Sequence, residues 1–221
     1  MFFLSLACMV IVLTGCKSGK DKAENEIRKL MAEKSCLPYS EMSCWINDTV
    51  QSVRPCEKAK MKLVVYIDST ECSECALNKM YMWEDFVRME KEYKSELFLI
   101  FIFQTQRNVK PQRLASLFKI TELNHPMYID DKNVFSKSNP DLPTEDSYHV
   151  FLLDEDNRVV LVGSPLFNSK IESLLRKEVE QRIKKLKTYI ARSSMSVLLF
   201  CCLLVKKVQQ NQRKTGACCT G

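Results

Sequence analysis

An apolar, strand-like run that leads directly into a Cys-x-x-Cys pair constrains this chain more than any other feature of its sequence. The run Met61–Ile67 is rich in Val, Ile and Tyr taken together, and the segment Cys72–Tyr93 that follows has apolar residues at helical spacing. Cys72 would lie at the start of that helix, where unpaired backbone N–H groups favour a thiolate over a thiol. Cys75 follows one turn later on the same side, from which it can resolve a mixed disulfide.

This order predicts a redox-active dithiol in which Cys72 is the nucleophile and Cys75 is the resolving thiol. Two other interpretations of the pair stay open: an inert structural disulfide and a metal site. A four-ligand zinc site usually needs a second Cys or His pair at regular spacing. The chain has no second Cys-x-x-Cys, and His125 and His149 stand apart in the sequence. We therefore expect neither a metal nor another cofactor.

The part of the chain after the cysteine pair has the pattern of an α/β domain. Leu97–Phe103 is an unbroken apolar run, which is typical of a parallel strand covered on both faces. Asp154–Asn157 has the residues of a tight hairpin turn. The other predicted elements are strands at 126–130, 148–153 and 158–162, and helices at 111–118 and 168–187. The order β-α-β-α-β-β-β-α predicts parallel crossovers followed by an antiparallel hairpin.

The N-terminus carries an export pattern. Residues 2–13 are uncharged and apolar, which is too short for a membrane span of about 20 residues but right for a secretory signal. Leu13-Thr-Gly-Cys16 closes this segment and resembles a bacterial lipobox, which implies lipidation of Cys16 and a protein anchored in the cell envelope, facing the periplasm. We therefore expect a signal peptide at 1–15, a tether and irregular segment at 16–59 with a short helix within 17–34, a domain at 60–187, and a tail of unknown role at 188–221.

Charge and cysteine content narrow the function classes further. The formal net charge is +6, and the basic residues are spread along the chain instead of forming dense blocks, so nucleic-acid binding is not expected. Eleven cysteines are many for a cytosolic protein. In an oxidising compartment Cys36, Cys44 and Cys56 could form one structural disulfide and leave one cysteine over.

The strand that leads into the cysteine pair, the second apolar strand, and the hairpin Phe151-Leu-Leu-Asp154 to Asn157-Arg-Val-Val160 with Gly163 after it resemble a thioredoxin-fold protein. The similarity is to exported, membrane-tethered thiol–disulfide oxidoreductases of the redoxin and cytochrome-maturation type. It implies a thioredoxin-like three-layer α/β fold, with a central mixed sheet flanked by helices. It also implies exchange with thiols and disulfides of exported proteins, with a membrane electron donor as a further partner.

The chain departs from this family in two places. Active members carry a cis-proline just before the strand that here begins near Tyr148, whereas the nearest proline in this chain is Pro143. They also carry proline or glycine between the cysteines, where this chain has Ser73 and Glu74. The departures leave open a non-catalytic binding or structural module, in which the pair is a static disulfide or a metal clip.

The residues around the pair add two expectations. The carboxylates of Asp68, Glu71 and Glu74 would raise the pKa of the Cys72 thiol and oppose the helix terminus, which favours a reductant or a slow exchanger. His149 could join the two thiolates in a Cu(I) or zinc site. The simpler interpretation of His149 is a residue on the exposed side of a strand, and that of His125 is a loop residue.

Overall fold

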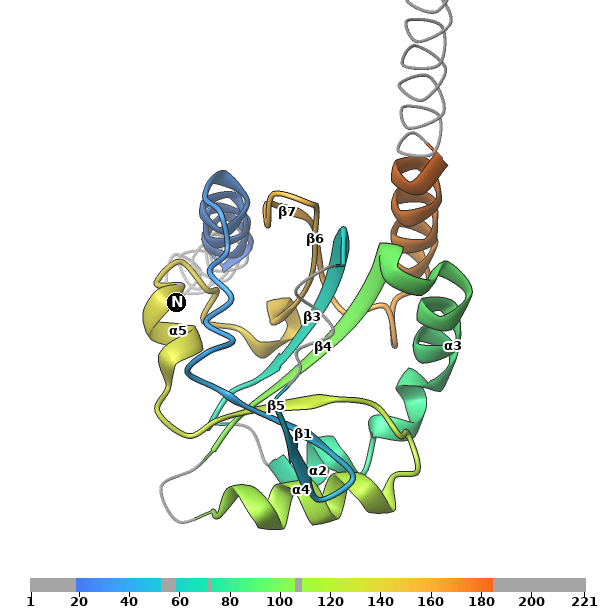
Figure 1. The fold of residues 1–221 in the computed structure, drawn as a ribbon. Helices are drawn as coiled ribbons and strands as arrows, with labels where there is room; N and C mark the ends of the chain where they lie inside the picture. The colour runs from blue at the N-terminus through green and yellow to red at the C-terminus, as the bar shows by residue number, and fades with distance from the viewer. Residues whose placement is uncertain (1–18, 53–58, 71–72, 106–108, 185–221) are drawn as a thin grey trace, which may run out of the picture. The chain divides into compact units, whose positions relative to one another are not determined.

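The computed structural model describes residues 19–52, 59–70, 73–105 and 109–184 (Figure 1). The predictions for the signal peptide, Cys16, Cys56, Glu71, Cys72 and the tail fall outside these residues.

The chain divides into two compact units, residues 1–176 and 177–221. In the second, residues 177–184 are helical and carry the ion pairs Arg182–Glu178 and Lys184–Glu180. No helix within the described ranges combines the length and the apolar character that a bilayer span requires.

A mixed seven-stranded sheet forms the centre of the first unit, in the order β2-β1-β5-β4-β3-β6-β7. β3, β4 and β5 are parallel to one another, and β6 and β1 pair antiparallel with β3 and β5, respectively. β3 and β4 are buried along their whole length, as the unbroken apolar run Leu97–Phe103 predicts for β4. The strands are Ser43–Ile46 (β1), Thr49–Gln51 (β2), Met61–Ile67 (β3), Leu97–Gln104 (β4), Met127–Asp130 (β5), Val150–Leu153 (β6) and Val159–Val162 (β7).

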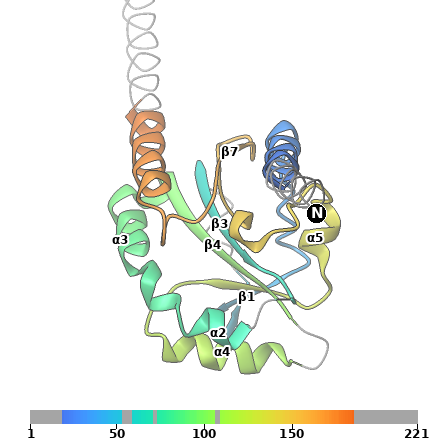
Figure 2. The ribbon, with the colours of Figure 1, turned by 180° about the vertical axis from the view of Figure 1, so that it is seen from behind.

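One face of the sheet is covered by the helix at 19–32 and by α5 (Val134–Ser138), as Figures 1 and 2 show. Because side chains alternate along a strand, every second residue of β3, β4 and β5 points to this face. Val64, Ile100 and Tyr128 meet there with Leu30 from the first helix and Phe135 from α5 in one buried cluster.

The opposite face is covered by three helices and a helical turn. They are α2 (Ser73–Leu77), the 3-10 turn η2 (Met80–Trp83), α3 (Glu84–Tyr93) and α4 (Pro111–Ile120). The ring of Phe101, on β4, lies 5.8 Å from Trp83 and 6.2 Å from Phe118. The helix that begins at 169 adds Arg176, whose guanidinium lies 5.7 Å from the centre of the Phe86 ring.

The predicted thioredoxin-like three-layer fold is confirmed. A parallel βαβ unit is followed by an antiparallel hairpin and a helix, and the cysteine pair follows the first strand of that unit. The hairpin turns where the sequence predicts it. Asn157 has a positive φ of 60°, and the Asp154 carboxylate accepts the N–H groups of Asp156 and Arg158.

The prediction of an irregular segment before residue 60 is wrong for residues 43–51. β1 and β2 form a hairpin there, and β1 adds to the edge of the sheet beside β5. The turn consists of Asn47 and Asp48, both with positive φ, which is the backbone of a two-residue hairpin turn. Both strands of this hairpin are short, and their apolar residues do not alternate regularly with polar ones. No periodic pattern in the sequence therefore predicts the hairpin.

The prediction of one continuous helix from Cys72 to Tyr93 is also wrong. α2 ends at Leu77, and a 3-10 turn leads into α3. Leu77, Met80, Trp83 and Phe86 recur every third residue and are all buried. A 3-10 turn has three residues per turn and so keeps such a series on one side, facing the sheet.

α5 lies in a stretch that the sequence pattern leaves without structure. The fully buried carboxylate of Asp130, at the end of β5, accepts the backbone N–H groups of Val134 and Phe135, both at 2.9 Å. A carboxylate is a favourable partner for the free N–H groups at the start of a helix. It stabilises a helix of only five residues.

The pKa of Glu26 is expected to fall below its ordinary value of 4.5, mainly because its carboxylate accepts the backbone N–H of Thr144 at 3.0 Å. A lowered pKa in the folded state means that this contact stabilises the fold above the unfolded-state pKa and is lost as the pH falls through the folded-state value. In an NMR titration, the Thr144 amide proton should therefore shift with a midpoint below 4.5. The step should vanish in Glu26→Gln and remain in Glu24→Gln. A midpoint at or above 4.5 would contradict the contact.

Candidate functional site

Cys75 lies in the middle of α2 and is exposed. Its sulfur is in a disulfide. Cys36 and Cys44 are not disulfide-bonded, so neither of them is the partner of Cys75. The prediction of one structural disulfide among Cys36, Cys44 and Cys56 is wrong, because two of these three cysteines are not in disulfides.

α2 is short for the electrostatic role that the sequence assigns to it. It has five residues and leads into η2, whereas the sequence predicts a helix that continues to Tyr93. The helix dipole at its start is correspondingly smaller, although the free N–H groups of the first turn remain. Ser73, between the two cysteines, is buried, and its hydroxyl has no hydrogen-bond partner.

Glu74 is paired with a cation, which the sequence does not reveal. Its carboxylate accepts two hydrogen bonds from Arg113 on α4, from Nε at 3.1 Å and from Nη2 at 2.5 Å. Both side chains are more than half exposed, so the pair contributes little to stability. It does place a positive charge next to Glu74, which offsets the negative charge of that carboxylate.

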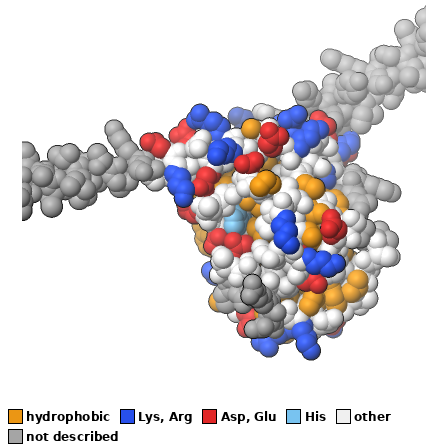
Figure 3. All heavy atoms as spheres, turned by 90° about the vertical axis from the view of Figure 1, so that its left-hand side faces the viewer, with side chains coloured by type: hydrophobic (Ala, Val, Ile, Leu, Met, Phe, Trp, Pro, Cys, Tyr) orange, Lys and Arg blue, Asp and Glu red, His pale blue; other side chains and the backbone are white. Residues whose placement is uncertain are grey.

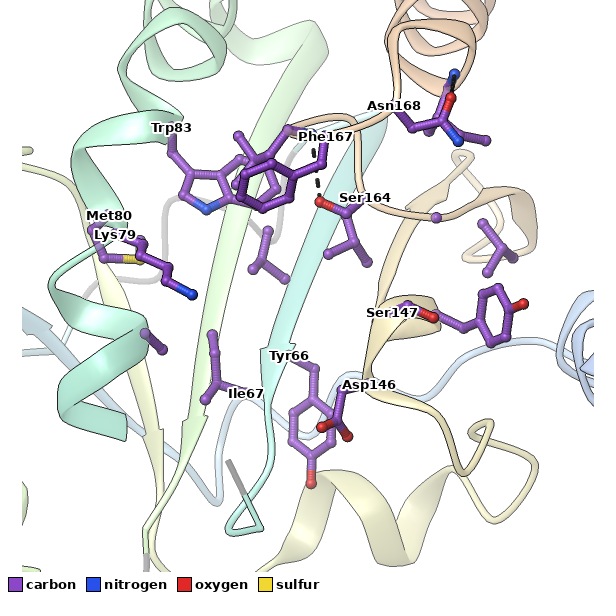
Figure 4. A pocket seen from close by; sticks show the side chains of 18 of the residues that line it. Tyr66, Ile67, Lys79, Met80, Trp83, Asp146, Ser147, Ser164, Phe167 and Asn168 are labelled. Carbon is purple, nitrogen blue, oxygen red and sulfur yellow. Dashed lines mark hydrogen bonds between the residues drawn. The ribbon is translucent and has the colours of Figure 1, made fainter. Parts of the chain in front are cut away.

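An open pocket of about 650 Å³ lies beside α2 (Figure 4). Cys75 forms part of its wall. Side chains from α2 and η2, from β3, from the turn η4 (Asp146–Tyr148) and from the segment after β7 surround it. Phe167, in that last segment, is 75% exposed although its side chain is wholly apolar. Other lining side chains, mainly apolar, are Tyr66, Ile67, Met80, Trp83, Leu166 and Ile171. An exposed sulfur thus lies beside a mostly apolar surface that can receive a peptide side chain.

The turn before β6 is the place at which the sequence resemblance implies a cis-proline. The carbonyl of His149 accepts the backbone N–H of Tyr66 at 3.0 Å, which holds this turn against β3. Within the described residues every peptide bond is trans. His149 is buried, so the interpretation of an exposed strand residue is wrong. The sequence does not single out Asp146, which lines the pocket and begins this turn.

His125 has a structural role. As predicted it lies in a loop, but it is buried, with its ring 5.2 Å from Phe101. Its two ring nitrogens lie 2.8 Å from the Glu90 carboxylate and 2.8 Å from the Pro126 carbonyl. The same Glu90 oxygen also accepts the N–H of Leu99 at 2.9 Å. These contacts connect α3, β4 and the loop, and they lie among the side chains that pack α3 and α4 on the sheet.

Charges of both signs are interspersed on the face that Figure 3 shows, and Lys and Arg gather there in no continuous patch. Several of the exposed charges are paired along a helix or between neighbouring elements, as in Arg88–Glu84 and Lys119–Asp48. Such pairs are typical of a solvated surface.

No protein-family model and no curated protein matches the chain. Several solved structures are similar to it. A proposed protein disulfide isomerase from Bacteroides thetaiotaomicron is 18% identical, with a TM-score of 0.44 over 68% of this chain and 93% of its own. The exposed lipoprotein thioredoxin Etrx1 from Streptococcus pneumoniae is 13% identical, with a TM-score of 0.43 over 62% of this chain and 98% of its own. PrxQ from Xylella fastidiosa is 10% identical, with a TM-score of 0.44 over 67% of this chain and 96% of its own. At these identities and scores the likeness says nothing about activity.

Proposed function

We propose that this protein exchanges thiols and disulfides with protein substrates through Cys72 and Cys75, with Cys72 as the disulfide partner of Cys75. One observation carries the proposal: the disulfide-bonded Cys75 is exposed in the wall of an open, largely apolar pocket. Exposed disulfides are the labile ones, whereas structural disulfides resist reduction. A purely structural disulfide does not need to lie beside a substrate-sized pocket.

The exchange proceeds in two balanced steps. A substrate thiolate attacks the Cys72 sulfur, which breaks the Cys72–Cys75 bond, forms a mixed disulfide and leaves Cys75 as a thiolate. A second substrate thiolate then attacks the substrate sulfur of the mixed disulfide, which releases Cys72. The substrate has lost two electrons and closed a disulfide, and the protein has become a dithiol. The same steps in reverse reduce a substrate disulfide, and the two reduction potentials decide the direction.

The cellular setting is part of the proposal and is supported by the sequence alone. The apolar residues 2–13 and the lipobox-like Leu13-Thr-Gly-Cys16 favour export, removal of residues 1–15 and lipidation of Cys16. The helix at 19–32 then follows the anchor almost at once. An anchored exchanger acts on other exported proteins and is returned to its working redox state by a donor in the membrane.

Phe167→Ala is expected to slow the exchange with a disulfide-bonded peptide by about three- to tenfold in kcat/KM, because the variant loses part of the apolar area that a docked peptide would cover. The rate with glutathione, which is too small to cover that area, should change by less than a factor of two, an estimate that follows from the same area argument. Stopped-flow fluorescence of a labelled peptide measures both rates.

Ile120→Ala is the matched control for this test. Ile120 is as exposed as Phe167, at 75%, and it does not line the pocket beside Cys75. It should leave both rates unchanged. Equal losses in the two variants, or no loss in Phe167→Ala, would show that the pocket does not receive the substrate.

A further inference from the structure

Three side chains lie close together next to the pocket: Asp68, Asp146 and His149. Thiol–disulfide exchange requires none of them. One ligand atom of each lies within 4.8 Å of the other two. Asp68 follows β3, and the other two lie in and directly after η4. We propose that these three residues bind a divalent transition metal ion, with zinc as the best match. The site would not involve the cysteine sulfurs.

The imidazole of His149 is prepared to act as a ligand. Its Nε2 lies 2.9 Å from the carbonyl oxygen of Pro143, which can only accept a hydrogen bond, so Nε2 carries the proton and donates. The lone pair of the neutral ring is therefore on Nδ1. Nδ1 is buried and has no hydrogen-bond partner, and the nearest carboxylate oxygen, from Asp146, is 3.7 Å away. The side chain is 5% exposed, so water cannot readily satisfy this nitrogen.

The Pro143 carbonyl has the role that an outer partner plays in many metal sites. A metal-binding histidine usually donates its second ring nitrogen to a backbone carbonyl or a carboxylate, which fixes the ring and selects the tautomer. His149 has this arrangement: its other ring nitrogen lies 3.7 Å from the Asp146 carboxylate, and Asp68 belongs to the same cluster of possible ligands. A bound cation would satisfy the buried nitrogen and would offset the repulsion between the two carboxylates.

The two carboxylates differ in how freely they can move. Oδ1 of Asp68 accepts the N–H and the hydroxyl of Thr70, both at 2.6 Å, so this side chain is oriented by its own turn. Asp146 is 48% exposed and can rotate. Ligands about 2.1 Å from a tetrahedral zinc ion lie about 3.4 Å apart. The three ligand atoms lie within 4.8 Å of one another, so a bound ion would draw them closer together, with Asp146 the most free to move.

The donor set indicates the class of metal. One imidazole nitrogen and two carboxylate oxygens suit zinc, with Mn²⁺ and Fe²⁺ as weaker alternatives, whereas Cu(I) prefers thiolates. Three protein ligands leave one position for water or for a group of a bound peptide. Because Asp146 lines the pocket that contains Cys75, that open position would face the peptide-binding surface.

Isothermal titration of the full-length, oxidised protein with zinc chloride tests this site. The thiols outside disulfides are first blocked with N-ethylmaleimide, and a chain without a histidine tag is used. We expect the wild-type protein to bind one zinc ion per chain. Asp146→Asn should bind zinc at least about tenfold more weakly than the wild type does. Glu145→Gln is the matched control: Glu145 is the exposed acid next to Asp146, its carboxylate accepts the Ser147 hydroxyl, and its loss should leave the affinity unchanged.

A second measurement uses only the wild-type protein, so its result does not depend on whether a variant folds. In the wild-type protein, zinc should shift the Nδ1 resonance of His149 in a ¹⁵N spectrum of the imidazole rings and leave both His125 nitrogens in place. Absence of zinc binding, equal affinity in wild type and Asp146→Asn, or a shift of His125 alone would each overturn the proposal. Since the cysteines are oxidised or blocked throughout, none of these outcomes bears on thiol–disulfide exchange.

Discussion

Cys75→Ser should accumulate substrate as a stable mixed disulfide on Cys72 and lose turnover completely. When the wild-type protein reduces a substrate disulfide, Cys75 attacks the sulfur of Cys72 in the mixed disulfide and releases the substrate, and serine has no thiolate with which to do so. Non-reducing electrophoresis and mass spectrometry of the reduced variant after incubation with a disulfide-bonded peptide would detect the adduct.

Cys36→Ser provides the control for this experiment. Cys36 is exposed and is not in a disulfide, so it reports adducts that form at any accessible thiol. Its replacement should leave both turnover and the Cys72 adduct unchanged. If Cys75→Ser turned over at the wild-type rate, or if its adduct mapped to Cys36, the assignment of Cys72 and Cys75 would be wrong.

Phe101→Ala should have the largest effect on stability and lower the free energy of unfolding by about 3–5 kcal/mol. Phe101 is fully buried on β4, and its ring contacts Trp83 before α3 and Phe118 on α4. Alanine would leave a cavity where these elements meet the sheet. Thermal unfolding followed by circular dichroism should show a fall of about 6–20 °C in Tm.

Phe167→Ala is the same chemical change at an exposed position. Surface substitutions usually change stability by less than about 0.5 kcal/mol, so its Tm should stay close to that of the wild type. Equal losses for the two variants would contradict the packing of α3 and α4 on this face of the sheet.

The sequence predicts the centre of the fold because local patterns are strong there. β3 and β4 are long apolar runs, and Asp154–Asn157 has turn residues that act within their own hairpin. The break after Leu77 carries a signal that could have been recognised, namely apolar residues every third position. The β1–β2 hairpin has only its turn residues Asn47 and Asp48 as a signal, and two short strands around a turn are weak indicators without the sheet edge that they join.

The site is less predictable because its parts meet only in three dimensions. The cysteine pair is adjacent in sequence and is easily recognised. Arg113 contacts Glu74 from another helix. β6, which pairs with β3 and places His149 near Asp68, comes from the far end of the domain. No periodicity or spacing within one segment encodes such pairs, since they depend on strand order and register.

The reduction potential of the Cys72–Cys75 pair tests the proposed function most directly. It is measured on the full chain by equilibration in glutathione or dithiothreitol buffers followed by alkylation and mass spectrometry. We predict a reversible two-electron couple between about −120 and −270 mV, the range of known exchangers. The couple should be lost in Cys72→Ser and in Cys75→Ser, and it should be unchanged in Cys36→Ser. A pair that stays oxidised below about −300 mV would be a structural disulfide and would contradict the proposed exchange.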